Sequence, residues 1–571
     1  MTYPIPFTQR ILNADLVVEG RVINQSSFWN SSNDFIYTSN IIEVYKVFKG
    51  NTTTNQIEVI TEGGIVGNTM IIVEPSLQFK IGQVGVFLGK PSTTAGSTIN
   101  FLSSSRFEGV AANQSFVNYD LTSFSATDPF NSYQDIATEI YQHISSVTGA
   151  PYLEMIPFNL FPSQNLGPGI NAQMVFPVIS SITSPSTAGT FNAITITGSN
   201  FGAGPFGGSR ALEFRDANNG GAGFIPTPAN HIISWSNTTI QAWVPTQAGS
   251  GNIRVTNDLG ESAVSAATTT IDYNQTNVVS GGLYYQPDLI NDNGASGYTF
   301  QYNTSFNSNT GAVAAFERAL QTWRCGTFVN FNKAGTTAIA CQALDNINLV
   351  TFDGSCALPS GVLGVSYSYY SGCGGGIWYL NENDLKFRTN STGSINWNFG
   401  PVATAGGLFD FESVAVHELG HSHQLGHTIS PITVMHYAIG PNIDRRTLTA
   451  TSETAGGTNI ISRSINTNSC GPTAMSSLNA GSCAINAPIA NFTGSPTTGC
   501  NSLNVTFTDA SIGSPTSWNW SFPGGTPNTF AGQTPPTITY SAPGSYPVTL
   551  TVVNAFGSDA ETKSSYITVN S

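Results

Sequence analysis

Short runs of alternating apolar and polar residues dominate the first 150 positions of the chain. Turn residues separate four runs that are rich in β-branched side chains: Leu16–Ile23, Ile36–Phe48, Gln56–Thr61 and Val84–Leu88. A period of two is typical of half-buried strands, so these runs predict a small barrel or sandwich, closed by a helix at Tyr133–Ile144. No titratable cluster accompanies them. We expect residues 1–150 to form a β-rich domain of unassigned family, with a structural, pro-region-like or binding role.

A second set of alternating runs follows a segment without periodicity. Residues 151–175 are rich in Pro, Gly and Asn, which is typical of a linker. Residues 176–273 then contain TITGSNFG (Thr195–Gly202), WSNTTIQAWVP (Trp235–Pro245) and GSGNIRVTNDLGES (Gly249–Ser262). This order of motifs resembles the IPT/TIG family of immunoglobulin-like domains, and the resemblance implies a β-sandwich.

The C-terminal residues 487–571 carry a third β pattern. WNWSFPGG (Trp518–Gly525) and YSAPGSYPVTLTVVNAFG (Tyr540–Gly557) resemble the PKD family, another immunoglobulin-like sandwich. Ser521 stands where that family usually has an acidic residue, which argues against an acidic ion site there. We expect both sandwich modules to be spacers or surface-binding modules without chemistry of their own.

Residues 277–486 mix helical and strand patterns and predict an α+β domain. Ala312–Cys325 has apolar residues at helical spacing, whereas Gly361–Tyr370 and Ile377–Phe387 alternate as strands. The expected fold class is therefore multidomain and mostly β, with sandwich or barrel modules flanking an α+β domain. The length of 571 residues agrees, since roughly 150 residues per domain gives about four domains.

Composition narrows the class of protein. Charged residues make up 9% of the chain, against about 25% in average soluble domains, yet 40% of residues are hydrophobic, so the modules can bury cores. The net charge of −14 gives no basic surface for a phosphate backbone, so we expect no nucleic-acid partner. No run approaches 18 apolar residues, so we expect no transmembrane segment. Residues 1–10 have no signal-peptide core, so we expect either that a leader has been removed or that the given sequence starts after one.

Six of the seven cysteines are clustered in the α+β segment. They are Cys325, Cys341, Cys356, Cys373, Cys470 and Cys483, with Cys500 beyond them. They form no C-x-x-C pairs of the kind that bind structural zinc, so three disulfides are the better interpretation, with sequence-local pairs preferred among the fifteen pairings. Disulfides place the protein in an oxidising compartment.

Histidine is concentrated in one place. The chain has seven histidines, and five of them lie in the run from His417 to His436. Asp410 can cap a helix in which His417 and His421 are one turn apart, so both rings can bind one metal ion, with Glu418 beside them. His423 is about 200° away from His421 at 100° per residue, so we expect it to be a solvated helix residue. Catalytic zinc usually takes three protein ligands, and His427, just after Gly426, is the expected third.

The string from His417 to His427 resembles the metzincin motif H-E-x-x-H-x-x-G-x-x-H, and the resemblance implies a zincin-type fold for the α+β domain. One position departs, because Gln424 replaces the glycine that takes a left-handed conformation, at a cost of roughly 1 kcal/mol unless the turn shifts to Gly426. Thr433–Tyr437 resembles the metzincin Met-turn, with Met435 beneath the histidines, and the short spacing resembles the matrixin branch. By this resemblance Tyr437 approaches the metal or the reaction intermediate, and a substrate-binding edge strand lies near Gly361–Phe387. Arg324-Cys325-Gly326 is not expected to be a cysteine switch, since it ends a helix.

These residues predict a secreted zinc-dependent endopeptidase. Zn²⁺ held by His417, His421 and His427 activates a water molecule, and Glu418 takes its proton and passes it to the departing amine. One alternative is a gluzincin-type protease in which Glu453 replaces His427. Another is a cell-surface adhesin with an inactive protease-like domain.

Partners and location follow from the same motifs. We expect protein or peptide substrates, with polysaccharide or cell-surface and matrix proteins as further partners of the β modules. The location is expected to be extracellular or at the cell surface, in a bacterium. A calcium requirement, in addition to Zn²⁺, is left open.

Overall fold

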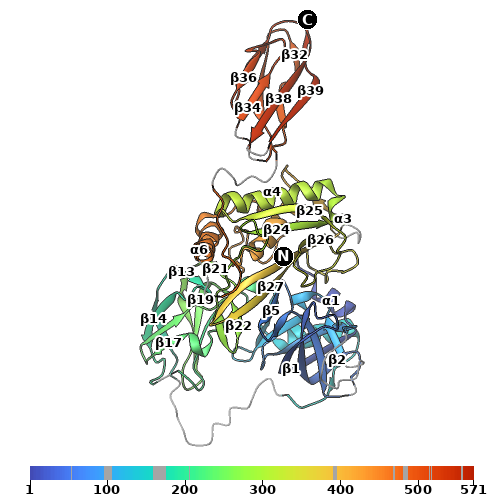
Figure 1. The fold of residues 1–571 in the computed structure, drawn as a ribbon. Helices are drawn as coiled ribbons and strands as arrows, with labels where there is room; N and C mark the ends of the chain where they lie inside the picture. The colour runs from blue at the N-terminus through green and yellow to red at the C-terminus, as the bar shows by residue number, and fades with distance from the viewer. Residues whose placement is uncertain are drawn as a thin grey trace, which may run out of the picture.

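The computed structural model describes residues 1–571 except 53, 95–105, 159–174, 205, 390–394, 467–469, 480–486, 514, 516 and 555–556. Several β-sheets dominate the fold, and the longest helices lie after residue 300, which confirms the predicted mostly-β multidomain architecture (Figure 1). Of the helices in the described residues, none has the length and apolar character needed to cross a membrane.

The N-terminal segment is a barrel. The strands of its sheet are β1 (Leu16–Trp29), β2 (Ile36–Lys49), β3 (Gln56–Glu62), β6 (Val84–Pro91), β7 (Arg106–Gly109), β8 (Phe116–Asp120), β9 (Ser125–Thr127), β10 (Ser132–Tyr133) and β11 (Leu153–Glu154). The order β1-β2-β3-β7-β6 closes because β1 also pairs with β6. Helix α1 (Phe7–Asn13), the π-turn Ile136–Tyr141 and α2 (Gln142–Thr148) pack on this sheet, and the last two overlap the predicted helix.

The chain continues to contact the barrel beyond residue 150. Leu153 pairs with Val47 of β2, and the rings of Tyr45 and Phe158 stack with their centroids 4.4 Å apart. The first part of the predicted linker is therefore attached to the barrel. Residues 159–174 of that linker lie outside the described residues.

The next segment is a sandwich of two antiparallel sheets. One sheet contains β12 (Val178–Ile182), β14 (Ala193–Ser199), β18 (Thr239–Trp243) and β17 (Ile232–Trp235), and the other β16 (Phe224–Pro226), β15 (Ala211–Asp216), β19 (Ala248–Thr256) and β20 (Ser262–Thr269). Alternate residues such as Ile196, Phe214 and Val255 point inward and are fully buried in the core between them. A short parallel pair, β13 (Ser186–Ala188) and β21 (Ile271–Asn274), joins the edge.

The predicted α+β segment contains a mixed sheet covered by helices. Its strands are β24 (Tyr298–Asn303), β25 (Phe331–Thr337), β26 (Asn348–Phe352), β27 (Gly364–Gly374) and β28 (Ile377–Phe387). Its helices are α3 (Thr304–Asn307), α4 (Thr310–Thr327), α5 (Phe411–Ser422) and α6 (Ala455–Ser464). Short pairs flank them: β22 (Val278–Ser280) with β23 (Leu283–Tyr285), and β29 (Trp397–Asn398) with β30 (Phe409–Asp410). β25, β24, β26 and β28 are parallel neighbours, whereas β27 runs antiparallel to β28.

Two strands of the N-terminal segment extend this sheet. The full order is β25-β24-β26-β28-β27-β5-β4, where β4 (Gly64–Val66) and β5 (Thr69–Glu74) form a hairpin between barrel strands β3 and β6. Neither strand is among those that the alternation of the sequence predicts.

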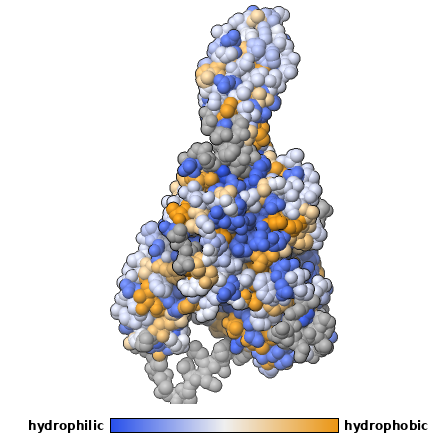
Figure 2. All heavy atoms as spheres, in the orientation of Figure 1, coloured by the Kyte–Doolittle hydropathy of each residue, from blue (hydrophilic) through white to orange (hydrophobic). Residues whose placement is uncertain are grey.

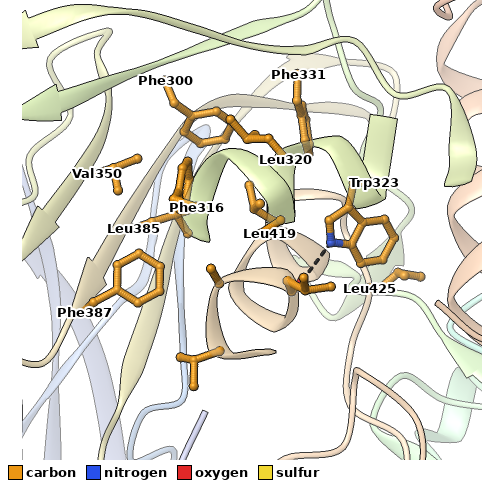
Figure 3. Packing of buried hydrophobic residues seen from close by; sticks show 14 of the residues in the cluster. Phe300, Phe316, Leu320, Trp323, Phe331, Val350, Leu385, Phe387, Leu419 and Leu425 are labelled. Atoms are coloured by element: carbon orange, nitrogen blue, oxygen red, sulfur yellow. Dashed lines mark hydrogen bonds between the residues drawn. The ribbon is translucent and has the colours of Figure 1, made fainter. Parts of the chain in front are cut away.

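The core of the α+β segment lies between the sheet and the helices (Figure 3). Phe316, Leu320 and Trp323 are buried on one face of α4, as the helical spacing predicts. The Trp323 indole Nε1 donates to the Val416 carbonyl oxygen at 2.7 Å. This bond ties α4 to α5, which carries the histidines.

Disulfides tie down the loops of this segment. Cys341–Cys356 is sequence-local, as predicted, but Cys373–Cys470 joins cysteines 97 residues apart, so the preference for local pairs was wrong there. The reason is topological: the tip of the β27–β28 hairpin meets the chain returning after α6. Cys325 is disulfide-bonded, Cys500 is free and exposed, and Cys483 lies outside the described residues.

The C-terminal segment is a second sandwich. Its sheets contain β31 (Phe492–Ser495), β33 (Leu503–Asp509), β37 (Ile538–Tyr540) and β35 (Gly525–Thr526), and β32 (Thr498–Cys500), β39 (Gly557–Asn570), β38 (Gly544–Asn554), β34 (Ser517–Ser521) and β36 (Thr529–Ala531). Phe492 and Trp520 lie in its core. On the face drawn in Figure 2, hydrophilic residues gather over the α+β segment and apolar residues are scattered, as is ordinary for a protein surface.

Candidate metal centre and catalytic site

Helix α5 presents the first two histidines from a buried position. Its N-cap is Asp410, as predicted, and the Asp410 carboxylate accepts hydrogen bonds from the backbone N–H of Ser413 at 2.9 Å and from its hydroxyl at 2.5 Å. Every residue of the helix is buried. The rings of His417 and His421 lie on the same side, with their Nε2 atoms 3.1 Å apart.

Each of the three predicted ligands uses its Nδ1 atom for a hydrogen bond to an oxygen. His417 Nδ1 bonds the Val434 carbonyl and His421 Nδ1 the Leu425 carbonyl, both at 2.8 Å. His427 Nδ1 bonds the Asn218 side-chain oxygen, also at 2.8 Å. Since these oxygens can only accept, the proton is on Nδ1 and the lone pair is on Nε2.

The three rings form a site that suits a metal ion. One nitrogen from each of His417, His421 and His427 lies within 4.8 Å of the others, and His427 Nε2 has no hydrogen-bond partner. Burial is the largest of the causes that lower the pKa of all three, to about 3 for His421, so the rings are neutral at ordinary pH. Three neutral imidazoles fit the ligand set of catalytic zinc.

Glu418 lies beside the histidines and is fully buried. Its Oε1 accepts a hydrogen bond from the Met1 amino group at 2.5 Å, and its Oε2 has no partner. Burial raises the pKa of Glu418, although the charge of the Met1 amino group opposes this shift. A buried carboxylate with one free oxygen can accept or deliver a proton.

The chain turns sharply between His421 and His427. Gln424 has φ of +68°, so it takes the left-handed conformation that the metzincin motif gives to glycine, and the turn does not shift to Gly426. The Gln424 N–H donates to the His421 carbonyl, and the Gly426 N–H donates to the Asn274 carbonyl, both at 2.8 Å. These bonds direct His427 back toward the helix.

The predicted Met-turn packs against the helix that carries the first two histidines. A Cβ atom on Gly420 would lie 2.2 Å from Met435 Sδ, so the methionine packs directly against the turn of helix between His417 and His421. The Met435 N–H donates to Glu453 Oε1 at 3.0 Å, and Glu453 also accepts from the Thr449 N–H at 2.9 Å. Glu453, the alternative metal ligand, thus holds the backbone of the Met-turn.

Two other predicted side chains have different surroundings from those expected. His423 points away from the ligands, but it is buried, not solvated: its Nε2 is 2.9 Å from the Thr327 hydroxyl, and its ring packs on Trp323. The expectation of a solvated residue was wrong because α4 covers that side of α5. The Tyr437 hydroxyl donates to the Pro129 carbonyl of the N-terminal segment at 2.7 Å. Its predicted catalytic role stays a prediction.

Asn218 is the supporting residue that the sequence did not indicate. It comes from the sandwich segment, 209 residues before His427. An Asn-Asn-Gly-Gly turn is a common loop signal, so nothing local marked Asn218 as the partner of a metal ligand.

Comparisons with known proteins agree with this geometry. Residues 292–456 match the family model described as Matrixin, and residues 485–569 match the PKD domain model. The PKD1 domain of the Vibrio cholerae metalloprotease PrtV is a solved structure with 30% sequence identity, covering 15% of this chain and 99% of that one, with a TM-score of 0.12. An NMR structure from Methanosarcina mazei has 29% identity over 18% of this chain and 66% of that one, with a TM-score of 0.13. No curated protein matches the chain.

The chain therefore carries the catalytic domain of a metalloprotease. Residues 292–456 form a matrixin domain, and residues 485–569 form a PKD domain.

Proposed function

We propose that this chain is a zinc endopeptidase in which His417, His421 and His427 hold Zn²⁺ and Glu418 transfers protons. The convergence of three buried, neutral imidazoles beside a buried carboxylate carries this proposal. Bound Zn²⁺ would polarise the scissile carbonyl and acidify a water molecule. Glu418 accepts the proton of the attacking water and delivers it to the departing amine, and its free Oε2 suits it for that task.

We also propose that the protein acts outside the cytosol on protein substrates. The two disulfides between described cysteines support an oxidising compartment. The first sandwich is proposed to be an IPT/TIG-like module, and its role and that of the PKD domain are proposed to be binding of cell-surface or matrix components.

Zinc content tests the ligand set. Purified chain is expected to hold one zinc ion per molecule by mass spectrometry of the metal, and His427→Ala is expected to lose it. His423→Gln is the matched control, because that buried histidine faces the other side of the helix and should not affect zinc. Stoichiometric zinc in His427→Ala would contradict the proposed ligands.

Glu418→Gln tests the proton transfer. The variant is expected to keep zinc and to lose peptide hydrolysis by about 100-fold or more, since positioned acid–base catalysis contributes roughly 10²–10⁴-fold. Cleavage is measured with a quenched-fluorescence peptide library, with Glu418→Gln placed in the otherwise unsubstituted chain and in a chain that also carries Ile72→Pro, which disrupts β5. Unchanged hydrolysis in that background would sink the assignment.

A further inference from the structure

The N-terminal segment lies in the groove where a matrixin substrate would have to lie. In the catalytic sheet β27 has β28 on one side, and its other side is covered by β5. The pairing is antiparallel and continuous, from Ser366 opposite Glu74 to Ser371 opposite Thr69. An extended peptide that adds itself to an exposed strand edge makes the same kind of ladder.

Residues 1–3 fill the groove on the other side of Glu418. The Leu363 N–H donates to the Met1 carbonyl at 3.0 Å, and the Tyr3 N–H donates to the Gly361 carbonyl at 2.8 Å. On the opposite wall, the Thr2 N–H donates to the Tyr437 carbonyl at 3.2 Å, and the Ile439 N–H donates to the Thr2 carbonyl at 3.1 Å. Thr2 is thus an extended residue held between two chain segments and has no exposed surface.

Met1 reaches the catalytic carboxylate itself. Its amino group donates to Glu418 Oε1 at 2.5 Å and to the Gly364 carbonyl at 2.9 Å. Its side chain is fully buried in the core of the catalytic domain. A charged amine is costly to bury unless it is paired, and here the pair is the carboxylate that hydrolysis requires.

This arrangement differs from that of a substrate in one respect. Gly364, which binds the Met1 amino group, is two positions before Ser366, which pairs with Glu74, so the two occupying segments approach each other near Glu418. Glu74 and Met1 are far apart in the sequence, and no peptide bond connects them there. The segments fill the groove on both sides of the site, and no bond joins one segment to the other there.

The barrel holds the N-terminal residues in place. Gln114 Oε1 accepts from the Ile5 N–H at 2.8 Å, and its Nε2 donates to the Tyr3 carbonyl at 3.0 Å. The buried pair Arg10–Asp128, at 2.5 Å, fixes α1 on the barrel just after these residues. Pre-organised segments of this kind lose little conformational entropy when they bind.

We propose that residues 1–158 are an inhibitor of the matrixin domain, built into the same chain, which fills the substrate groove with residues 1–3 and β5. The inference rests on the proposed function. No cysteine precedes Cys325, so this inhibitor covers the site without a thiol.

Two substitutions in the full chain test the inhibitor, one in each of the segments that fill the groove. Ile72→Pro disrupts β5, because proline cannot complete the ladder of a strand paired on both sides. Thr2→Arg places a long charged side chain where the fully buried Thr2 lies. The matched controls are Leu153→Pro, in the exposed strand β11 of the same barrel, and Thr8→Arg, on the exposed side of α1.

Hydrolysis of the peptide library is expected to rise about tenfold or more in Ile72→Pro and Thr2→Arg, and to stay unchanged in the controls. The reason is that a groove that is open in only a small fraction of molecules lowers the apparent rate of hydrolysis to that fraction. Hydrogen–deuterium exchange of the β27 amides is expected to be slow in the unsubstituted chain and faster in Ile72→Pro.

An unsubstituted chain that cleaves as fast as both variants, or whose β27 amides exchange as fast as those of Ile72→Pro, would overturn the proposal. A zinc-loaded Ile72→Pro chain that stays inactive while its β27 amides exchange freely contradicts the proposed protease function, and not the occupation of the groove.

Discussion

Gln424 shows how a single residue can depart from a motif without losing its geometry. It has φ of +68°, and neither polar atom of its buried side chain has a hydrogen-bond partner among the described residues. A left-handed conformation costs a non-glycine residue about 1 kcal/mol. We expect Gln424→Gly to raise the melting temperature by about 2–4 °C, the shift that 1 kcal/mol gives in a domain of this size, with zinc content unchanged. Gln424→Ala, which keeps the Cβ strain, is the control, and a lower melting temperature for the glycine variant than for the alanine variant would contradict the argument.

Residues whose role depends on local spacing could be predicted from the sequence. His417 and His421 share a face because four residues make about one helical turn, and Met435 follows the third histidine closely. The structure brings His417 and His421 together with His427, and Met435 packs against Gly420. The environment of His423 could not be predicted, because its burial depends on the packing of α4 against α5.

At the scale of elements, β28 carries two buried carboxyl groups that make the catalytic domain sensitive to pH. Burial raises the pKa of Asp384 to about 8, and burial together with the charge of Asp384 raises that of Glu382. The folded state therefore retains protons that the unfolded chain releases near pH 4. This stabilisation is complete at low pH and is lost as the pH rises toward the raised pKa values.

We expect the melting temperature of the catalytic domain to fall between pH 5 and pH 8 by about 2–4 °C for each kcal/mol lost, and Asp384→Asn to flatten this dependence. Differential scanning calorimetry at several pH values measures it, with the exposed Asp15→Asn as the control. Equal slopes for Asp384→Asn and the unsubstituted chain would show that Asp384 does not hold the proton.

The sequence predicted most elements but not the hairpin that inhibits. The four predicted barrel strands correspond to β1, β2, β3 and β6, because alternation marks strands with one buried face. β5 lies between β27 and β4 and contacts two cores, so its run of Met70, Ile71, Ile72 and Val73 does not alternate. Its partner lies almost 300 positions further along the chain, where periodicity gives no information.

At the scale of the whole molecule, the first three segments meet at one site. The barrel provides Met1 and β5, the matrixin domain provides the three histidines and Glu418, and the first sandwich provides Asn218. These contacts join three segments that the sequence pattern predicts to be separate domains. The metal centre, and the segments that cover it, should therefore respond to substitutions outside the catalytic domain.

Asn218 offers the clearest test of this coupling. Its side-chain oxygen accepts from His427 Nδ1–H at 2.8 Å and so fixes the ring with Nε2 toward the other ligands. Removing an outer partner of a metal-binding histidine typically lowers metal affinity 10–100-fold, so we expect Asn218→Ala to weaken zinc binding by about that factor. Asn219→Ala is the control, since Asn219 is the next residue and its amide bonds Asp216 instead of a ligand. Competition with a chromogenic chelator measures both affinities. Equal zinc affinity in the two variants would mean that the sandwich does not support the site, whereas a loss confined to Asn218→Ala would tie the metal centre to a segment outside the matrixin domain.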